Sequence, residues 1–373
     1  MKILLYFILI SGLALVTSGC SDNSIMESES KLADTLSMDF SCYTSKSTTS
    51  RASSNYLIDG SNTITIPNGN SIGVFSFYQG PNKWDDITSH VASFMNNQQM
   101  VAKTLNSTVS FTYSPTKYWP NNPNDKLSFF AYYPWNRISD NSLDVGIENI
   151  EDEDKMCVRF NVKDNPNEQI DLMLSDLIKD KTYQDTNNEG KVNFVFHHIL
   201  SLVKINLIFD DDMKSIAKLK VNSANIAGLY NAGTCHPSYN KSTAKTEFTW
   251  APYFKTGTST QQYVFDADLL SSTTLNQTGN VLLMVPQQLN TNVVFTINYD
   301  IIFMDSNGNE KYRYTNNEQN VVLKNAGSIT EWLPGKKYNY TFTIGLKPIK
   351  MDATNDDWSN SGYDADIKGS NTN

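Results

Sequence analysis

The feature that most constrains the fold is a regular alternation of apolar and polar residues, which recurs along the chain. In the segment 292–303 every second side chain, from Val293 to Phe303, is apolar. Successive side chains of a strand point to opposite faces, so a period of two predicts a half-buried β-strand. The segment runs into Asn307–Gly308, which is typical of a hairpin turn, and Lys311–Tyr314 is expected to begin the return strand.

The same alternation predicts many further strands. It is equally regular over Tyr338–Leu346, which follows a turn at Leu333–Lys336. Other strands are expected at 36–42, 62–66, 71–78, 109–113, 127–133, 156–162, 192–196 and 202–209. Two segments, Asp85–Ala102 and Asp171–Lys181, are predicted to be helical. Many short strands separated by turns favour an all-β architecture of sandwiches over a parallel α/β sheet.

A polar stretch near the middle of the chain, Lys179–Lys191, is the best candidate for a linker. The length of 373 residues suggests two domains. We therefore expect two β-sandwich domains in tandem, an N-terminal one at residues 36–185 and a C-terminal one at 190–358. A short polar tail follows at 359–373.

The N-terminus has the anatomy of a secretory signal. A positive start, Met1–Lys2, precedes the apolar run Ile3–Val16 and a small-residue exit that ends at Cys20. A cysteine at this exit is a candidate lipidation site, which predicts a lipoprotein with a signal peptide at 1–20 and a flexible polar tether at 21–35. The alternative is an ordinary cleaved signal with an incidental cysteine.

Composition excludes several classes of partner and site. The net charge is −9 and the basic residues do not cluster, which argues against nucleic acid and against charge-driven binding to anionic lipid. If Cys20 carries lipid, Cys42, Cys157 and Cys235 remain. An odd number of cysteines cannot all pair, so one disulfide at most is expected, and the lack of CxxC spacing argues against zinc.

We find no pattern that predicts an enzyme, a metal site or a cofactor. The pair His197–His198 lies in a predicted strand, where adjacent side chains point to opposite faces. One histidine is therefore expected to be buried and hydrogen-bonded, and the other exposed. The acidic runs Glu148–Asp154 and Asp210–Asp212 lack the ligand spacing of a calcium loop. No nucleophile or phosphate-binding motif is present.

Aromatic residues are dense at Tyr118–Pro120 and Phe129–Trp135. Exposed rings stack on sugars, so a surface lipoprotein that binds glycans through Trp119 and Trp135 is an alternative function. Large aromatic side chains also dominate core burial, and we favour that interpretation.

The order and spacing of several segments resemble the fimbrillin family of Bacteroidales, the FimA-like and Mfa-like subunits of type V pili. The matching segments are Ser50–Ala52, Ile72–Phe77, Tyr118–Pro120, Leu127–Pro134, Asp171–Leu174, Phe194–Val203, Leu282–Gln287, Leu333–Ile344 and Asp357–Trp358. The resemblance implies two transthyretin-like β-sandwiches and a role as a subunit of a cell-surface fimbria. It also implies export as an outer-membrane lipoprotein that is acylated, for example with palmitate, at Cys20.

The resemblance further implies an assembly route by donor-strand exchange. A protease removes the first strand after a basic residue, here Arg51, and a strand of a neighbouring fimbrillin subunit fills the groove. The expected donor is the segment 347–358, with candidate residues Ile349, Met351 and Trp358. Arg51 could instead be an ordinary loop cation. Stalk, tip and anchor roles, and a glycan or protein of a host or bacterial surface as the adhesion target, all stay open.

Overall fold

The computed structural model describes residues 36–44, 66–105, 108–135, 143–150, 153–187, 189–240, 245–254, 262–265, 281–325, 328–346 and 349–357. Nearly all regular elements formed by these residues are strands, which confirms the all-β fold class. None of the helices in these ranges combines the length and the apolar character that crossing a bilayer requires.

The elements follow one another in the order expected of a strand-rich chain. The first part contains β1 (Asp39–Thr44), β2 (Ser71–Gly80), η1 (Trp84–Asp86), β3 (Met95–Leu105), β4 (Thr108–Thr112), β5 (Lys126–Tyr133), β6 (Leu143–Ile150), β7 (Glu153–Asn161), η2 (Pro166–Glu168), β8 (Met173–Ser175), β9 (Ile178–Lys181), η3 (Gln184–Thr186) and β10 (Lys191–His198). The second part contains β11 (Ser201–Phe209), α2 (Asp211–Lys214), β12 (Ala217–Ala227), β13 (Ala232–Asn240), β14 (Lys245–Tyr253), β15 (Gln262–Phe265), β16 (Val281–Met284), β17 (Gln287–Gln288), β18 (Val294–Met304), β19 (Glu310–Val322), η4 (Leu323–Asn325), β20 (Glu331–Trp332), β21 (Lys336–Ile344) and β22 (Lys350–Asp357).

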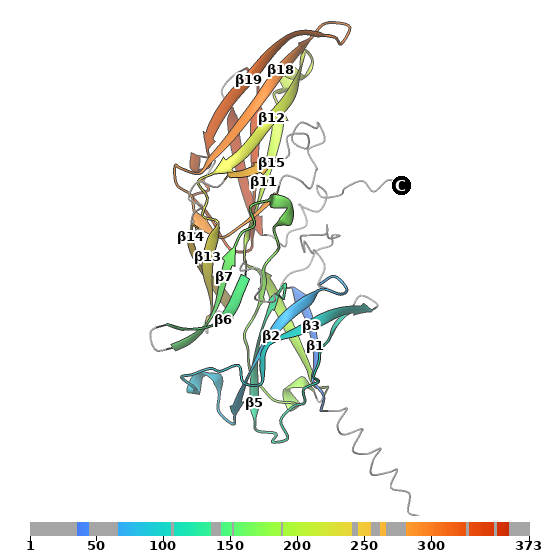
Figure 1. Ribbon diagram of the computed structural model, residues 1–373, viewed down its shortest axis with the longest axis vertical. Coiled ribbons are helices and arrows are strands. Elements are labelled where there is room, and N and C mark those ends of the chain that lie inside the picture. The colour runs from blue at the N-terminus through green and yellow to red at the C-terminus, as the bar shows by residue number, and fades with distance from the viewer. Residues whose placement is uncertain are drawn as a thin grey trace, which may run out of the picture.

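The strands of the first part close into a circuit at one end of an elongated molecule (Figure 1). They pair in the order β2-β3-β4-β1-β10-β8-β5, and β5 pairs back with β2. β9 extends the sheet beside β5. One of the two buried hydrophobic clusters draws its side chains from these strands, including β1. β1 is therefore an interior member of the circuit.

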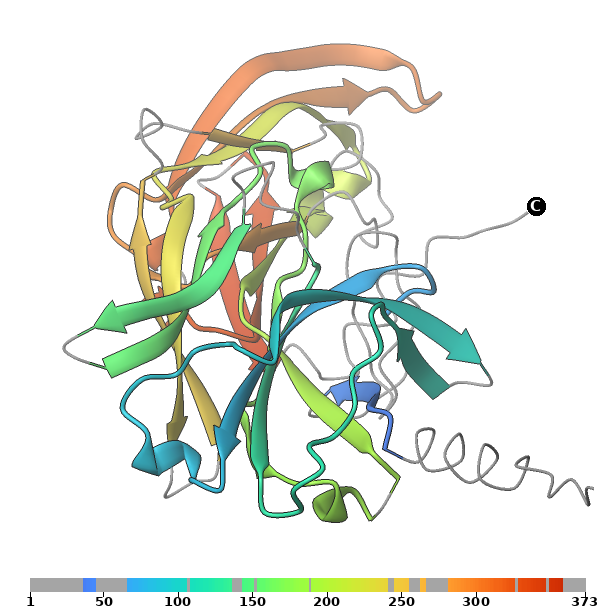
Figure 2. The same ribbon diagram turned by 60° about the horizontal axis from the view of Figure 1, so that its bottom comes forward.

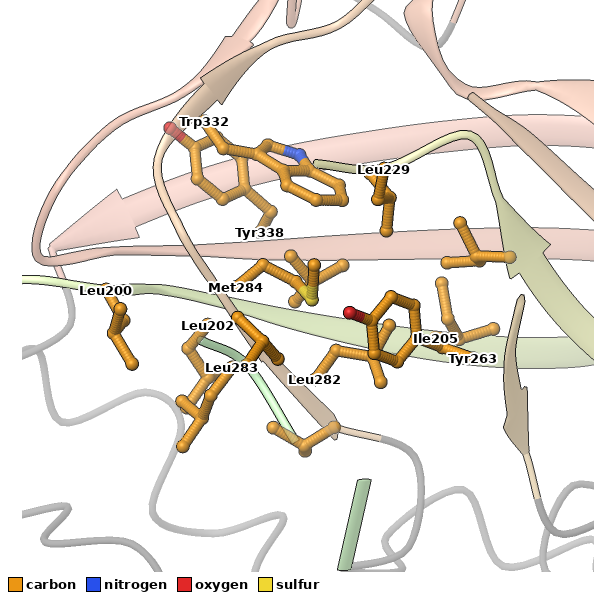
Figure 3. Packing of buried hydrophobic residues seen from close by; sticks show 14 of the residues in the cluster. Leu200, Leu202, Ile205, Leu229, Tyr263, Leu282, Leu283, Met284, Trp332 and Tyr338 are labelled. Atoms are coloured by element: carbon orange, nitrogen blue, oxygen red, sulfur yellow. The ribbon is translucent and has the colours of Figure 1, made fainter. Parts of the chain in front are cut away.

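The second part is a sandwich of two four-stranded sheets, β16-β11-β21-β22 and β15-β12-β18-β19. Phe295 of β18 stacks on Phe342 of β21 with ring centroids 4.2 Å apart, so the sheets meet face to face. Figure 3 shows this core from close by, with Leu282–Met284 of β16 and Tyr338 of β21 packed near Trp332. β22 lies at the edge of its sheet, paired only with β21.

Strand pairing crosses the expected domain boundary at 185–190. β6 and β7 belong in sequence to the first part, yet they form one sheet with β13 and β14 of the second, in the order β14-β13-β7-β6. β10 follows the boundary in sequence but pairs with β1 and β8 of the first part. The two parts therefore share a sheet and a hydrophobic cluster, and their division into tandem domains stays a prediction.

Both predicted helices are wrong. The segment 85–102 contains the short η1 and most of β3, and β3 pairs with β2 and β4. The segment 171–181 contains β8 and β9. In β8 the successive side chains of Met173, Leu174 and Ser175 are all fully buried, because this short strand is covered on both faces. Tertiary burial of both faces overrides local periodicity in such strands.

The predicted hairpin at Asn307–Gly308 is confirmed. It joins β18 and β19, and Gly308 has a φ of +80°, which glycine adopts without strain. The Asp305 carboxylate accepts hydrogen bonds from the amides of Asn307 and Asn309 at 2.8 and 2.9 Å. The turn is therefore held by its own backbone amides.

Candidate functional site

The candidate site is the position that β1 occupies in the circuit. β1 runs parallel to β10, in a register from Asp39 opposite Lys191 to Thr44 opposite Phe196. On its other side it pairs antiparallel with β4 through Ser41. Figure 2 shows this short strand among the strands of the first part. Because both of its edges are paired, removing β1 would leave two unpaired strand edges.

The side chains of β1 that face the core fill a continuous hydrophobic track. Met38, just before the strand, and Phe40 are each 1% exposed, and Cys42 is 8% exposed. A buried Phe contributes about 1.5–3 kcal/mol through the apolar surface that it removes from water. The strand is therefore held by side-chain burial as well as by its backbone hydrogen bonds.

Phe40 lies at the centre of an aromatic cluster. Its ring stacks on Phe194 of β10, with centroids 5.9 Å apart, and meets Phe129 of β5 edge-on at 6.0 Å. Tyr113, just after β4, completes the cluster with an edge contact at 5.5 Å. Edge-to-face and stacked ring pairs add stability beyond simple area burial. The cluster thus forms a deep aromatic pocket for Phe40, the middle one of the three core-facing residues.

The cysteines are buried thiols, and none of Cys42, Cys157 and Cys235 forms a disulfide within the described residues. Burial raises the pKa of the Cys42 thiol to about 12. Only the thiolate is nucleophilic, so Cys42 is chemically protected while β1 stays in place. Its reactivity is consequently a direct reporter of β1 opening.

The structure places the sequence-predicted residues in two groups. Cys20, Arg51 and Trp358 lie outside the described residues. Met351 lies in β22, where it pairs with Phe342 of β21, and Ile349 directly precedes the strand. Both side chains are partly buried against the core. The structure therefore holds Ile349 and Met351 against the second sandwich, apart from β1.

The aromatic residues predicted as glycan contacts are not an exposed platform. Trp119 is only 2% exposed, and its indole nitrogen donates a hydrogen bond to the carbonyl of Gly190 at 3.0 Å. Trp135 is partly buried, and its indole nitrogen donates to the carbonyl of Asn97 at 3.4 Å. Trp119 therefore stabilises the first part and is not available to stack on a sugar.

The adjacent histidines point to separate partners, as their strand positions predict. His198 is buried and bonded to Asp171 at 3.0 Å, whereas His197 is partly exposed and bonded to Asp176 at 3.0 Å. Burial alone would raise the pKa of Asp176, but hydrogen bonds from His197 and Thr246 lower it below its usual value. Within the described ranges, no three potential ligand residues are grouped to hold a metal.

Sequence reasoning missed the partners of β1. The parallel pairing with β10 joins residues far apart in sequence, and no local pattern announces it. The segment Tyr113–Trp119 and Gly190 also surround the start of β1, although only the aromatic density of the first was noticed. A glycine directly before the β10 strand was the one signal that could have pointed to a close backbone contact.

Comparison with known proteins gives a consistent result. A family model described as "Fimbrillin-like" matches residues 50–358. The curated protein "Fimbrium subunit Fim1C" of Phocaeicola vulgatus is 23% identical over 372 residues, covering 90% of this chain and 91% of that protein. The crystal structure of a fimbrial protein from Bacteroides vulgatus superposes with a TM-score of 0.61 at 19% identity, covering 86% of this chain and 99% of the other. The extent of the family match shows that this chain belongs to the fimbrillin-like family.

Proposed function

We propose that this chain is a structural or adhesive subunit of a cell-surface fimbria and assembles by exchanging β1 for a strand of a neighbouring subunit. The observation that carries the proposal is the position of β1, a six-residue strand in the interior of a closed circuit. Residues 45–70 separate it from β2 in the sequence and contain Arg51. The family match begins at residue 50 and so leaves β1 outside it.

Loss of β1 would leave an energetically unfavourable groove that a replacement strand could fill. It would expose the track lined by Phe129 and Phe194 and unpair the facing edges of β4 and β10. Unpaired strand edges and exposed apolar surface are both costly in water. An added strand satisfies the backbone groups and buries the apolar track together, as in β-augmentation.

The C-terminal segment suits the role of donor. β22 has a neighbour on one side only and its core-facing side chains are only partly buried, so pairing with β21 alone holds it in its sheet. Ile349, Met351 and Ala353 alternate in the same spacing as Met38, Phe40 and Cys42. In both segments two large apolar residues precede a small one.

The first experiment tests maturation. The full chain is treated with an arginine-specific protease, and the product is analysed by N-terminal sequencing and by electrophoresis in SDS without heating. We expect a new terminus at Ala52 and SDS-resistant ladders. The matched variant Arg51→Ala should give neither. Ladders formed by Arg51→Ala with an intact N-terminus would contradict exchange of β1.

The second experiment tests the donor. Met351→Asp places a charge on the core-facing side of the segment, and we expect it to abolish ladders while the monomer stays folded. Thr354→Asp adds the same charge on the exposed face of the same strand and should leave the ladders intact. Equal ladders from both variants would exclude this segment as the donor.

We also propose that Cys20 carries the lipid that brings the subunit to the outer membrane. Under this proposal cleavage after Arg51 releases the lipid with the first strand, whereas an uncut chain stays anchored. Metabolic labelling with palmitate should mark the precursor and not the polymer, and Cys20→Ser should lose the label. Label that persists in polymers would instead indicate an anchor subunit.

A further inference from the structure

The residues just before β1 are held by a part of the molecule that is separate from the β1–β10 pairing. We call the segment Tyr113–Trp119 together with Gly190 the clamp. The pairing with β10 begins only at Asp39, yet Ser37 already forms a β-bridge with Tyr118 of the clamp. The bound stretch is therefore longer than the strand itself: its contacts run from Leu36, whose carbonyl the clamp binds, to Thr44, which pairs with Phe196.

The clamp holds this stretch by main-chain groups. The amide of Trp119 donates a hydrogen bond to the carbonyl of Leu36 at 2.9 Å, and the amide of Met38 donates to the carbonyl of Lys117 at 2.9 Å. The hydroxyl of Tyr113 donates to the carbonyl of Met38 at 2.9 Å. Such contacts do not depend on the side chains of the bound strand, so the clamp can bind strands of many different sequences.

The clamp is itself rigidly placed. The carbonyl of Gly190 accepts hydrogen bonds from the indole of Trp119 at 3.0 Å and from the amide of Asp39 at 3.1 Å. Trp119 also packs edge-on against Phe129 with centroids 6.0 Å apart. Gly190 has a φ of +68°, and a Cβ there would overlap the carbonyl of Ser37. Only glycine lets the bound strand pass this close.

We propose that the clamp seats the first residues of whichever strand fills the position of β1, and that the core-facing positions then admit residues 347–355 of a second copy at the nine positions 36–44 in one register only. The inference rests on the proposed exchange of strands and specifies which residues of the partner enter and where. Numbered from Leu36, positions 1, 3 and 4 bind the clamp, and positions 3, 5 and 7 point into the core.

Residues 347–355 fit these nine positions. Ile349, Met351 and Ala353 would take the places of Met38, Phe40 and Cys42. Pro348 would occupy position 2, and it leaves in place the groups whose hydrogen bonds to the clamp are given above, the carbonyls of positions 1 and 3 and the amides of positions 3 and 4.

The neighbouring registers do not fit. A shift of two residues in one direction would place Ala353 in the aromatic pocket of Phe40 and Asn355 at the buried position of Cys42. A cavity and a buried amide without a partner are both destabilising. The opposite shift would place Lys347 at the buried position of Met38. Only one register puts apolar side chains at all three core positions.

One arm of the test uses the unprocessed monomer and needs no assembly. Trp119→Phe removes the indole donor of the clamp and keeps an aromatic ring. Trp332→Phe is the matched control, because it removes an indole hydrogen bond to Tyr340 in the other sandwich. Alkylation of Cys42 is followed by peptide mass spectrometry, and alkylation of Cys235 in the same sample reports whether the chain stays folded.

We expect Trp119→Phe to speed the alkylation of Cys42 by about 2- to 10-fold, the change in population that one hydrogen bond produces. Cys235 should stay protected, and Trp332→Phe should leave the alkylation of Cys42 unchanged. An equal rate for Cys42 in wild type and Trp119→Phe would overturn the clamp, whether or not the protein polymerises.

The other arm measures the register in polymers. In the expected register Asp352 of the donor takes the place of Ser41, opposite Asn193. A chain that carries Asp352→Cys and Asn193→Cys should therefore form disulfide-linked oligomers. Pairing Asp352→Cys with Lys191→Cys or Val195→Cys tests the shifted registers. Links at 191 or 195 without a link at 193 would overturn the inference, whereas the absence of all polymers contradicts the exchange and leaves the alkylation arm to decide on the clamp.

Discussion

β1 and β22 are both short strands near the ends of the described chain, and both carry alternating apolar residues, but the fold treats them in opposite ways. β1 has neighbours on both sides, and its central side chain, Phe40, is 1% exposed. β22 has one neighbour, and its core-facing residues Met351 and Ala353 are only partly buried. The molecule thus holds one strand that is paired on both edges and deeply buried, and one edge strand that is paired on one side and less buried.

The difference teaches what makes a strand replaceable. A replacement strand in an interior position pairs with two backbone edges and fills an aromatic pocket, and both contacts are favourable. A strand that leaves an edge position gives up its pairing with one neighbour only. Under the proposed exchange, a strand that moves from the edge of one copy into the interior of another would therefore gain apolar burial.

The largest effect is expected for the centre of β1. Phe40→Ala should lower the free energy of unfolding by about 3–5 kcal/mol, since it empties a pocket between three aromatic rings. Urea denaturation followed by circular dichroism measures this loss. A loss below about 1 kcal/mol would show that β1 contributes no more than an edge strand, and the comparison would fail.

The buried thiol of Cys42 is expected to have an effect on stability comparable with that of Phe40→Ala, and this effect depends on pH. Burial holds its pKa at about 12, above the value near 8.5 of a free thiol, so only the released strand loses this proton between the two values. The stability contributed by the buried thiol is fully present below about pH 8.5 and is lost as the pH rises toward 12. We expect iodoacetamide to modify Cys42 at pH 8 at least ~100-fold more slowly than free cysteine. Rapid modification of the intact monomer would mean that β1 is not stably docked.

A smaller effect is expected at the core-facing side of β22. Met351→Ala should lower the free energy of unfolding by about 1 kcal/mol, because the side chain is only partly buried and a fully buried one contributes about 1.5–3 kcal/mol. The same urea titration measures it. If Met351→Ala costs as much as Phe40→Ala, β22 is not the less strongly held of the two strands.

The smallest effect is expected for the ion pair at the end of β22. Lys336 of β21 bonds Asp357, and about a third of each side chain is exposed to solvent. Exposed pairs contribute about 0.2–1 kcal/mol. Lys336→Ala should therefore change the unfolding midpoint only slightly, and high salt should reduce the difference. A strong, salt-independent loss would indicate that the pair secures β22 to its sheet.

Much of the strand content could be read from local pattern. Period-two segments such as 292–303 and 338–346 form β18 and β21, and the Asn307–Gly308 turn lies where it was expected. The opposite orientation of His197 and His198 also follows from the strand period. These features depend on neighbouring residues only, so the sequence carries them directly.

The site itself could be predicted only in part. That an early strand would be apolar on one face followed from Met38, Phe40 and Cys42. The sequence could not predict that this strand lies parallel to β10 and against the clamp, because Trp119 and Gly190 contact it across long sequence separations. Local reasoning also failed in β3, and in β8, which is short and covered on both faces. For the aromatic residues it favoured core burial, which is the outcome for Trp119, over the alternative of a sugar contact.

By itself, then, the sequence determined that the chain is all-β, where most strands run, and which face of each is apolar, because alternation is a property of adjacent residues. The tertiary structure decided which strands become neighbours, and so which apolar segment is interior and which lies at an edge. Pairing brings together groups from distant parts of the chain, and the same alternating pattern serves either position. The contrast between β1 and β22, on which the proposed exchange depends, therefore exists only in the folded molecule.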